Sequence, residues 1–385
     1  MTMPPLALYI HWPFCLAKCP YCDFNSHVRA KTDVAAWQAA LFTDMAHEAA
    51  LLPGRELTSI FFGGGTPSLM PPALVAGLIE QASRHWRLAT DIEITLEANP
   101  SSVEAANFAA LASAGINRVS LGLQALDDET LHFLGRLHNA AEGLAALDVA
   151  QRHFARVSFD LIYARPGHTP ESWDAELARA LALGTGHLSL YQLTIEPGTR
   201  FATLVREGRF TPLDDDAAGD LFALTRERTR AAGLPAYEIS NHARPGEESR
   251  HNLTYWRYGD YAGIGPGAHG RRLETATVRH KKPENYLRAV SEQGHGLADE
   301  RALPRAEQAS EALLMGLRLG EGIDLAALGA RFGLPETALI DPAKRAFHIG
   351  NGLLREEGPR LIVTEAGMPL LDALLAELVP ADLVT

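Results

Sequence analysis

The sequence has few cysteines, no long apolar run and no excess of basic charge. No apolar stretch in its 385 residues approaches the roughly 20 residues that a membrane-spanning helix needs. The opening MTMPPLALYIHWPFC lacks the basic segment and long apolar stretch of a secretory signal. The net charge of −12 argues against nucleic acid as a partner, because phosphate binding needs a basic surface. We therefore expect a cytoplasmic protein of two or three domains with no transmembrane segment.

All three cysteines, Cys15, Cys19 and Cys22, lie close together in a C-x3-C-x2-C pattern. An odd number packed this tightly is not a disulfide framework. Thiolates suit iron–sulfur clusters and zinc, and three on one loop can hold three irons of a four-iron cluster while the fourth stays open. The alternatives are a zinc site completed by His11 or His27, or three unrelated buried cysteines. Since the sequence offers no second C-x2-C knuckle, the pattern favours the cluster.

Short β-type runs alternate with helical stretches in the first part of the chain. Each run is rich in β-branched or aromatic residues and is bounded by Gly, Pro, Asn or Asp. The expected strands are Leu6–His11, Ser59–Gly63, Glu93–Ala98, Arg118–Gln124, Val157–Tyr163 and His187–Ile195. The expected helices are Val34–Leu51, Pro72–Arg84, Val103–Ala114, Ala140–His153 and Pro170–Leu183.

This alternation predicts βαβ units around a parallel sheet, as an α/β fold. An open doubly wound sheet and a closed or partial barrel are both compatible with it. Polar or Gly-rich residues follow nearly every strand, as in CLAKCPYC, GGGTPS, EANP and YARPG. In a barrel these positions meet at one rim, where barrel enzymes place their sites, and this favours the barrel.

The pattern changes after about residue 235, so we expect three parts. Residues 1–236 form the barrel domain, and residues 237–300 form a connecting segment rich in Gly and aromatic residues. Residues 301–385 form a small, mainly helical C-terminal domain with short β-type pieces such as Arg360–Thr364. The acidic and apolar end of the chain argues against a DNA-binding winged helix there.

The cysteine pattern after the first strand, with Tyr21 before the last cysteine, resembles the radical SAM superfamily. The βα series resembles its partial (β/α)6 barrel. The resemblance implies a four-iron four-sulfur cluster on Cys15, Cys19 and Cys22, which reduces S-adenosylmethionine bound at the open iron to methionine and a 5′-deoxyadenosyl radical. The glycine turn after the second strand resembles the family's methionine-binding segment, and a tight turn is the structural alternative. That segment holds Gly63, Gly64, Gly65 and Thr66.

Within the superfamily, the chain is similar to the coproporphyrinogen-dehydrogenase-like subfamily, which includes the decarboxylase HemN and the heme chaperone HemW. YIHWPFC, FFGGGTPS, EITLEANP, NRVSLGLQ, GRLH and FDLIYARPG follow its blocks in order. The resemblance implies that S-adenosylmethionine is contacted by Tyr9, Tyr21, Gly64 and Glu97. The decarboxylase binds a second S-adenosylmethionine, and the resemblance implies that its contacts correspond to Gln124, Arg136 and Asp160. Alternatively, the polar side chains satisfy backbone groups at strand ends, and Arg136 forms a surface ion pair.

Two departures separate this chain from the decarboxylase. The position two residues after the third cluster cysteine holds Phe24 where that enzyme has another cysteine, and the chain reaches Cys15 without a long N-terminal extension. HNLTYW, which begins at His251, resembles a heme-binding motif of the HemW type. A neutral imidazole is a common axial ligand of heme iron, although a lone histidine can equally be a turn or core residue. We expect the motif in an exposed loop, with His269 as a weaker candidate.

The resemblance therefore implies a heme chaperone, with oxygen-independent coproporphyrinogen III dehydrogenation as the alternative function. It implies heme or a related tetrapyrrole as ligand, acceptor hemoproteins as partners, and a reductant such as flavodoxin or ferredoxin. It also leaves a homodimer open. A third hypothesis is a zinc-stabilised barrel of unknown activity.

Overall fold

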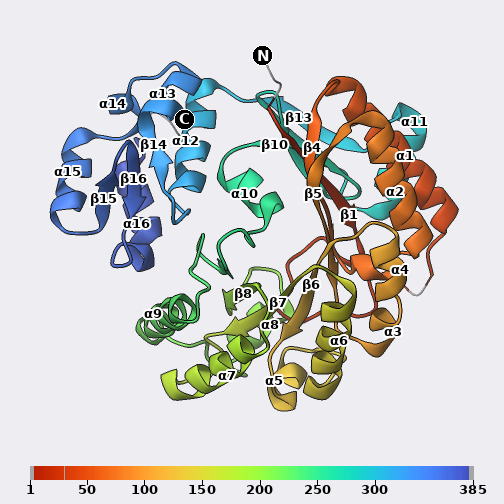
Figure 1. Ribbon diagram of the computed structural model, residues 1–385, viewed down its shortest axis with the longest axis horizontal. Helices are drawn as coiled ribbons and strands as arrows, with labels where there is room; N and C mark the ends of the chain where they lie inside the picture. The colour runs from red at the N-terminus through yellow and green to blue at the C-terminus, as the bar shows by residue number, and fades with distance from the viewer. Residues whose placement is uncertain (1–3, 30, 381–385) are drawn as a thin grey trace.

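The central feature of the fold is an open, eleven-stranded sheet in the order β13-β12-β11-β10-β1-β4-β5-β6-β7-β8-β9 (Figure 1). The structure is a computed structural model and describes residues 4–29 and 31–380. The six strands of the predicted βα series are consecutive in the sheet and parallel. These are β1 (Leu6–Trp12), β4 (Glu56–Gly64), β5 (Arg87–Ala98), β6 (Arg118–Gln124), β7 (Arg156–Tyr163) and β8 (His187–Gln192).

Helices cover the outer side of these strands and complete an incomplete (β/α)6 barrel (Figure 1). The predicted alternation is confirmed, although the helix expected over 103–114 is broken in two. The helices are α1 (Val34–Leu51), α2 (Pro72–His85), α3 (Ser102–Ala105), α4 (Phe108–Ser113), α5 (Asp128–Phe133), α6 (Ala140–His153), α7 (Pro170–Ala182), α8 (Arg200–Arg206) and α9 (Asp215–Ala231). A short 3-10 helix, η1 (Pro67–Leu69), follows β4.

Side-chain caps fix where several of these helices begin. Asp33 accepts a hydrogen bond from a first-turn backbone N–H of α1, and Asn139 and Thr169 form capping boxes on α6 and α7.

The core lies between these helices and the sheet. Fully buried apolar side chains come from successive strands: Leu8, Ile60, Leu96, Leu121, Phe159 and Leu188. Because these side chains are buried together, the register of the parallel strands is fixed, and their carboxyl ends meet at one rim.

Residues 237–302 extend the sheet at both edges. The short β9 (Asn241–Ala243) pairs antiparallel with β8, while β10 (Asp260–Ile264) pairs parallel with β1. An antiparallel series continues from β10 through β11 (His269–Arg272), β12 (Thr275–Arg279) and β13 (Leu297–Ala302). Helix α11 (Pro283–Gln293) lies beside α1 (Figure 1).

The HNLTYW motif is helical, which corrects our expectation of an exposed loop. It lies in α10 (Arg250–Trp256), on the inner side of the sheet (Figure 1). Ser249 caps this helix by accepting a hydrogen bond from the Asn252 backbone N–H. Polar composition suggested a loop, but the N-cap serine begins a helix that packs against β4.

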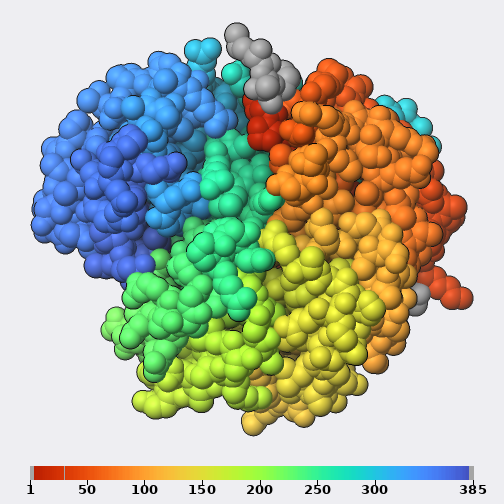
Figure 2. Space-filling model, viewed as in Figure 1, coloured from red at the N-terminus to blue at the C-terminus, as the bar shows by residue number. Residues whose placement is uncertain are grey.

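The C-terminal segment forms a small, mainly helical domain with its own apolar core. Figure 2 shows this domain, in blue, beside the barrel and separated from it at this face by the green segment that contains α10. Its elements are α12 (Arg305–Gly316), β14 (Ile323–Asp324), α13 (Leu325–Phe332), α14 (Glu336–Leu339), α15 (Pro342–Gly350), β15 (Leu354–Glu357), β16 (Arg360–Val363), η2 (Met368–Leu370) and α16 (Leu371–Leu378). None of the helices in the described ranges is long and apolar enough to cross a membrane.

Candidate functional site

The three cysteines line one cavity of about 310 Å³ at the carboxyl ends of the parallel strands. Cys15 lies in β2 (Phe14–Cys15), which pairs with β3 (His27–Val28) and thereby closes the base of the cysteine loop. A turn in which the Cys22 N–H donates to the Cys19 carbonyl at 3.2 Å orders the rest of the loop. The fold thus brings all three thiols to the rim that the sequence predicts.

Two of the sulfurs accept hydrogen bonds from side chains on other elements. The Thr66 hydroxyl donates to Cys15 Sγ at 3.4 Å, and Arg136 Nη1 donates to Cys19 Sγ at 3.3 Å. Burial raises the pKa of the Cys15 and Cys22 thiols, so metal binding must displace their protons. Soft donors that accept hydrogen bonds fit an iron–sulfur cluster. In residues 4–29 and 31–380, no three His, Cys, Asp or Glu side chains gather closely enough to hold a single metal ion.

The glycine turn at the end of β4 leaves no room for side chains. Gly64 has a φ of +115°, and a Cβ atom there would lie 2.7 Å from the His11 ring. A Cβ on Gly65 would lie 3.0 Å from Cys15 Sγ. The Gly64 N–H donates to Glu97 Oε2 at 3.3 Å, so the turn is held against β5. These glycines allow the backbone to border the cavity next to the cysteine loop.

Two half-buried carboxyl groups, Glu97 on β5 and Asp160 on β7, line the cavity. Burial, together with the charge of Asp160, raises the pKa of Glu97 to about 8. Burial also raises the pKa of Asp160 to about 6, although the Ser120 hydroxyl donates to it at 3.2 Å. Such groups can accept hydrogen bonds from ligand hydroxyls or amines, and perturbed carboxyls in a cavity are typical of functional sites.

Arg136 joins the cysteine loop to the strand ends. Besides Cys19, it contacts Asn99 Oδ1 at 2.6 Å and the Gly122 carbonyl at 3.0 Å through Nη2, and Nη1 lies 3.5 Å from the Tyr21 hydroxyl. Its Nε is buried without a hydrogen-bond partner. The surface ion pair that we considered for Arg136 is therefore wrong.

Gln124 ends β6 in a left-handed conformation, with a φ of +70°. Its Oε1 atom is buried and has no hydrogen-bond partner, and its side chain lines the cavity. A strained residue with an unpaired buried acceptor is a candidate ligand contact.

Two of the residues predicted to bind S-adenosylmethionine, Tyr9 and Gly63, do not line this cavity. The Tyr9 hydroxyl is hydrogen-bonded to His11 Nδ1 at 2.9 Å, and His11 Nε2 is hydrogen-bonded to the Asn25 carbonyl at 2.9 Å. Tyr9 therefore reaches the cysteine loop only through His11, and its ring lies beside Phe61. Its predicted role in binding S-adenosylmethionine stays a prediction.

His251 is buried inside the barrel, with only 1% of its surface exposed. Its ring lies 4.7 Å from that of Phe61 at 17°, and its Nδ1 is hydrogen-bonded to the Ser59 hydroxyl at 3.1 Å. Its Nε2 is hydrogen-bonded to the Tyr255 hydroxyl. Burial lowers the pKa of His251 to about 3, so the imidazole is neutral at physiological pH. Heme ligation by this ring requires it to leave both partners.

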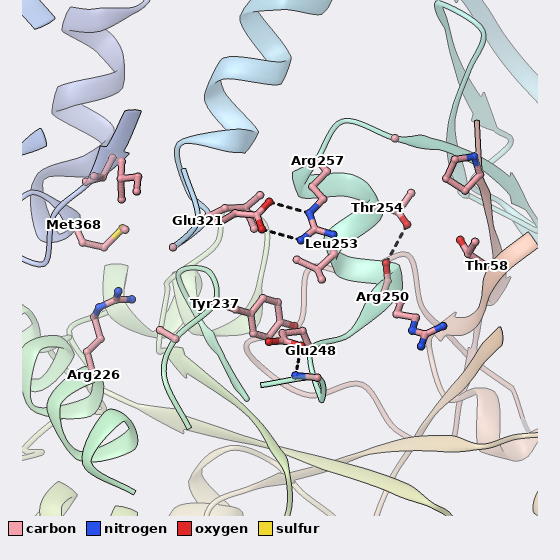
Figure 3. A pocket seen from close by; sticks show the side chains of 18 of the residues that line it. Thr58, Arg226, Tyr237, Glu248, Arg250, Leu253, Thr254, Arg257, Glu321 and Met368 are labelled. Carbon is pink, nitrogen blue, oxygen red and sulfur yellow. Dashed lines mark hydrogen bonds and ion pairs between the residues drawn. The ribbon is translucent and has the colours of Figure 1, made fainter. Parts of the chain in front are cut away.

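Sequence reasoning missed two features. Asn99, which accepts from Arg136 and donates to Thr66 Oγ1 at 3.1 Å, lies within the EANP segment that follows β5, and its position after a strand was the available signal. The second feature is a cleft of about 1290 Å³ between the barrel and the C-terminal domain. In Figure 3, α10 contributes Leu253 and Thr254 to this cleft, Arg257 follows the helix and is paired with Glu321, and Arg226 lies on the opposite side.

Comparisons with known proteins match the barrel and the C-terminal domain to separate families. Residues 9–180 match the Radical SAM superfamily, and residues 303–370 match the HemN C-terminal domain. The chain is 38% identical to the heme chaperone HemW of Escherichia coli K12 over 97% of this chain and 98% of that protein. It is 41% identical to bovine mitochondrial radical S-adenosyl methionine domain-containing protein 1 over 82% and 74% of the two chains. The solved structure of E. coli coproporphyrinogen III oxidase (HemN) has the same fold, with a TM-score of 0.82 at 24% identity, covering 97% and 89%.

Proposed function

We propose, from the premise that this chain belongs to the HemN/HemW-like branch of the radical SAM superfamily, that it binds heme and transfers it to acceptor hemoproteins. The observation that carries this proposal is the similarity to heme chaperones over nearly the whole of both chains. The exposed Phe24 at the cavity mouth supports it, because the decarboxylase has a cysteine at this position. We expect a cytoplasmic location.

In this proposal, Cys15, Cys19 and Cys22 hold a four-iron four-sulfur cluster. When bound, the cluster supplies one electron to S-adenosylmethionine. Thr66 and Arg136 orient two of the sulfurs, the Gly64 turn borders the amino acid part of the cofactor, and Glu97 accepts hydrogen bonds from it. Gln124 and Asp160 bind the remainder, because they line the same cavity from neighbouring strand ends.

We further propose that His251 ligates heme after α10 moves. The helix stands between the barrel interior and the large cleft, and that cleft is lined by Arg250, Leu253 and Thr254 of α10 and by Arg257, which follows it. A rotation of α10 that brings the imidazole toward the cleft breaks the hydrogen bond to Ser59 on β4. Tyr255 moves with the same helix, and its hydrogen bond is lost when Nε2 ligates iron; each bond is worth about 1 kcal/mol. The cleft has the volume for a tetrapyrrole.

The test is an anaerobic assay on protein reconstituted with iron and sulfide, in the presence of S-adenosylmethionine and a reductant. One sample receives heme and a parallel sample receives coproporphyrinogen III. We expect a stable heme spectrum that is lost in His251→Ala, and no protoporphyrinogen. Protoporphyrinogen formed with stoichiometric 5′-deoxyadenosine would contradict the proposal and favour the dehydrogenase.

The cluster itself is tested by replacing each cysteine in turn. Cys15→Ala, Cys19→Ala and Cys22→Ala should each lose the bound iron and the visible absorbance of the cluster, because two thiolates leave two irons of the cluster without protein ligands. Metal analysis of the three proteins checks this. Full iron content in any variant, or zinc in place of iron in the unaltered protein, would exclude the cluster assignment.

A further inference from the structure

The lysines of this chain are distributed unevenly. The sequence contains five lysines among 385 residues, and four of them lie in two short segments at 18–31 and 281–282. The four, Lys18, Lys31, Lys281 and Lys282, are exposed. The fifth, Lys344, lies in the C-terminal domain. A chain with a net charge of −12 thus concentrates its ammonium groups next to the cluster cysteines.

The fold joins the two lysine segments although about 250 residues separate them. The Asn25 side chain, three residues after Cys22, donates to the Pro266 carbonyl at 2.8 Å and to the Lys281 carbonyl at 2.9 Å. Arg29 forms an ion pair with Glu284 in the first turn of α11. The two segments therefore lie side by side, and we call their exposed lysines, Lys18, Lys31, Lys281 and Lys282, the cation surface.

These lysines do not serve internal ion pairs. Within the described ranges, every ion pair between a basic and an acidic side chain uses arginine or histidine as the cation, and none of the four lysines contacts a carboxylate. Three acidic side chains lie in or directly beside these segments: Asp23 and Asp33 are exposed, and Glu284 forms an ion pair with Arg29. Unpaired ammonium groups on an acidic protein favour an acidic partner.

Exposed apolar side chains lie within the cation surface. Leu16, Phe24 and Val28 are 55%, 61% and 57% exposed, and all three belong to the cysteine loop. Leu16 and Phe24 also line the mouth of the cluster cavity. An apolar patch surrounded by charge is typical of a transient protein-binding surface.

We propose that the cation surface docks an acidic protein that carries single electrons, such as a flavodoxin, and places it beside the cysteine loop. This inference rests on the proposed cluster and adds the place and chemistry of its reductant. One electron leaves the reduced flavin of the partner and enters the oxidised cluster. No bond forms or breaks in this transfer. The lysines act before transfer, by raising the rate of encounter.

The test measures anaerobic reduction of the reconstituted protein by reduced flavodoxin in stopped flow. Lys281→Glu/Lys282→Glu should lower the bimolecular rate constant by about tenfold or more at low salt, and the difference should shrink near about 0.5 M salt. Lys344→Glu is the control, because it makes the same Lys→Glu exchange on the C-terminal domain, with a charge change of −2 against −4 in the double variant. Reduction by dithionite, a small molecule, should proceed at nearly equal rates in all three proteins.

A second readout does not depend on the cluster. Carbodiimide cross-linking of the protein to flavodoxin, followed by mass spectrometry, should join flavodoxin carboxylates to Lys281, Lys282 or Lys31. If the glutamate variant does not fold, Lys281→Gln/Lys282→Gln takes its place, with about half the charge change and a smaller loss of rate. Circular dichroism and iron content confirm folding in each case.

Unchanged flavodoxin kinetics in both lysine variants would overturn the proposal. If the unaltered protein is a dimer that dissociates in these variants, while the rate of reduction by flavodoxin is unchanged, the proposal would be overturned. The cation surface would then bind a second copy of this chain. Failure of heme binding with normal flavodoxin kinetics would refute the chaperone function alone. Protein that holds no iron would refute the cluster, and the docking proposal with it.

Discussion

Arg136 places its Nη1 atom 3.3 Å from the sulfur of Cys19, across 117 positions of sequence. Its other contacts reach Asn99 and the end of β6, so one guanidinium connects a cluster ligand to the rim of the barrel. Hydrogen bonds and positive charge near a cluster sulfur stabilise the reduced state of a cluster.

Replacing Arg136 should therefore make the cluster harder to reduce. We expect Arg136→Gln to lower the reduction potential by about 60 mV, which corresponds to a tenfold change in equilibrium for one electron. A redox titration followed by electron paramagnetic resonance measures this. Arg179→Gln is the control, since it removes an arginine bond to the Leu126 carbonyl away from the cavity. Equal potentials in all three proteins would contradict the role of Arg136.

Gly64 should not tolerate a methyl group. The left-handed φ and the 2.7 Å approach to His11 predict that Gly64→Ala costs about 2–3 kcal/mol of stability and displaces the turn that borders the cavity. Urea unfolding measures the stability, and calorimetry measures binding of S-adenosylmethionine. Gly219→Ala is the control, because Gly219 lies within α9 with open space around it and should gain up to about 1 kcal/mol.

The raised pKa of Glu97 predicts how the stability of the folded protein depends on pH. Its folded pKa of about 8 lies above its ordinary value of 4.5, so the folded protein holds this proton between those values while the unfolded chain releases it. Stability therefore falls as pH rises through that window. Glu97→Gln removes the ionisation, and its stability relative to the unaltered protein should rise by about 3 kcal/mol from pH 5.5 to 8.5. If urea unfolding shows that the stabilities of the two proteins change equally with pH across that range, the raised pKa of Glu97 is excluded.

His251 predicts the opposite dependence. Its folded pKa of about 3 lies below its ordinary value of 6.5, so protonation of the unfolded chain destabilises the folded state as pH falls through this window. We expect His251→Gln to cost about 2–4 kcal/mol near neutral pH, and this cost should shrink by about 2–3 kcal/mol between pH 6.5 and 4.5. Denaturant titrations at both pH values check this. A cost that does not vary with pH would mean that the imidazole is not buried as a neutral group.

Tyr255→Phe separates the structural role of His251 from ligation. This variant removes the hydroxyl partner of Nε2 but keeps the imidazole. If His251 ligates heme after α10 moves, the variant should bind heme at least as tightly as the unaltered protein, because one bond that restrains the ring is gone. Weaker heme binding in both Tyr255→Phe and His251→Ala would indicate that α10 acts only through its packing.

The sequence by itself determined the local parts of this protein. The alternation of β-type runs and helical stretches predicted the six parallel strands, because backbone periodicity is written in neighbouring residues. The three cysteines and the glycine turn could be assigned to one rim because parallel strands of a βα series end on the same side. The break between α3 and α4 and the helical form of HNLTYW were not predicted, since capping and packing outweigh composition there.

Only the tertiary structure decided which distant side chains meet. It placed Arg136 on Cys19, buried His251 against Ser59 across 192 positions, and joined the lysines at 281–282 to the cysteine loop through Asn25. Hydrogen bonds between residues so far apart depend on how strands and helices pack, and no local pattern records that packing. The sequence therefore identified the chemistry of the site, while the packing of α10 and the extended sheet decided which groups are buried and which surface surrounds the cluster loop.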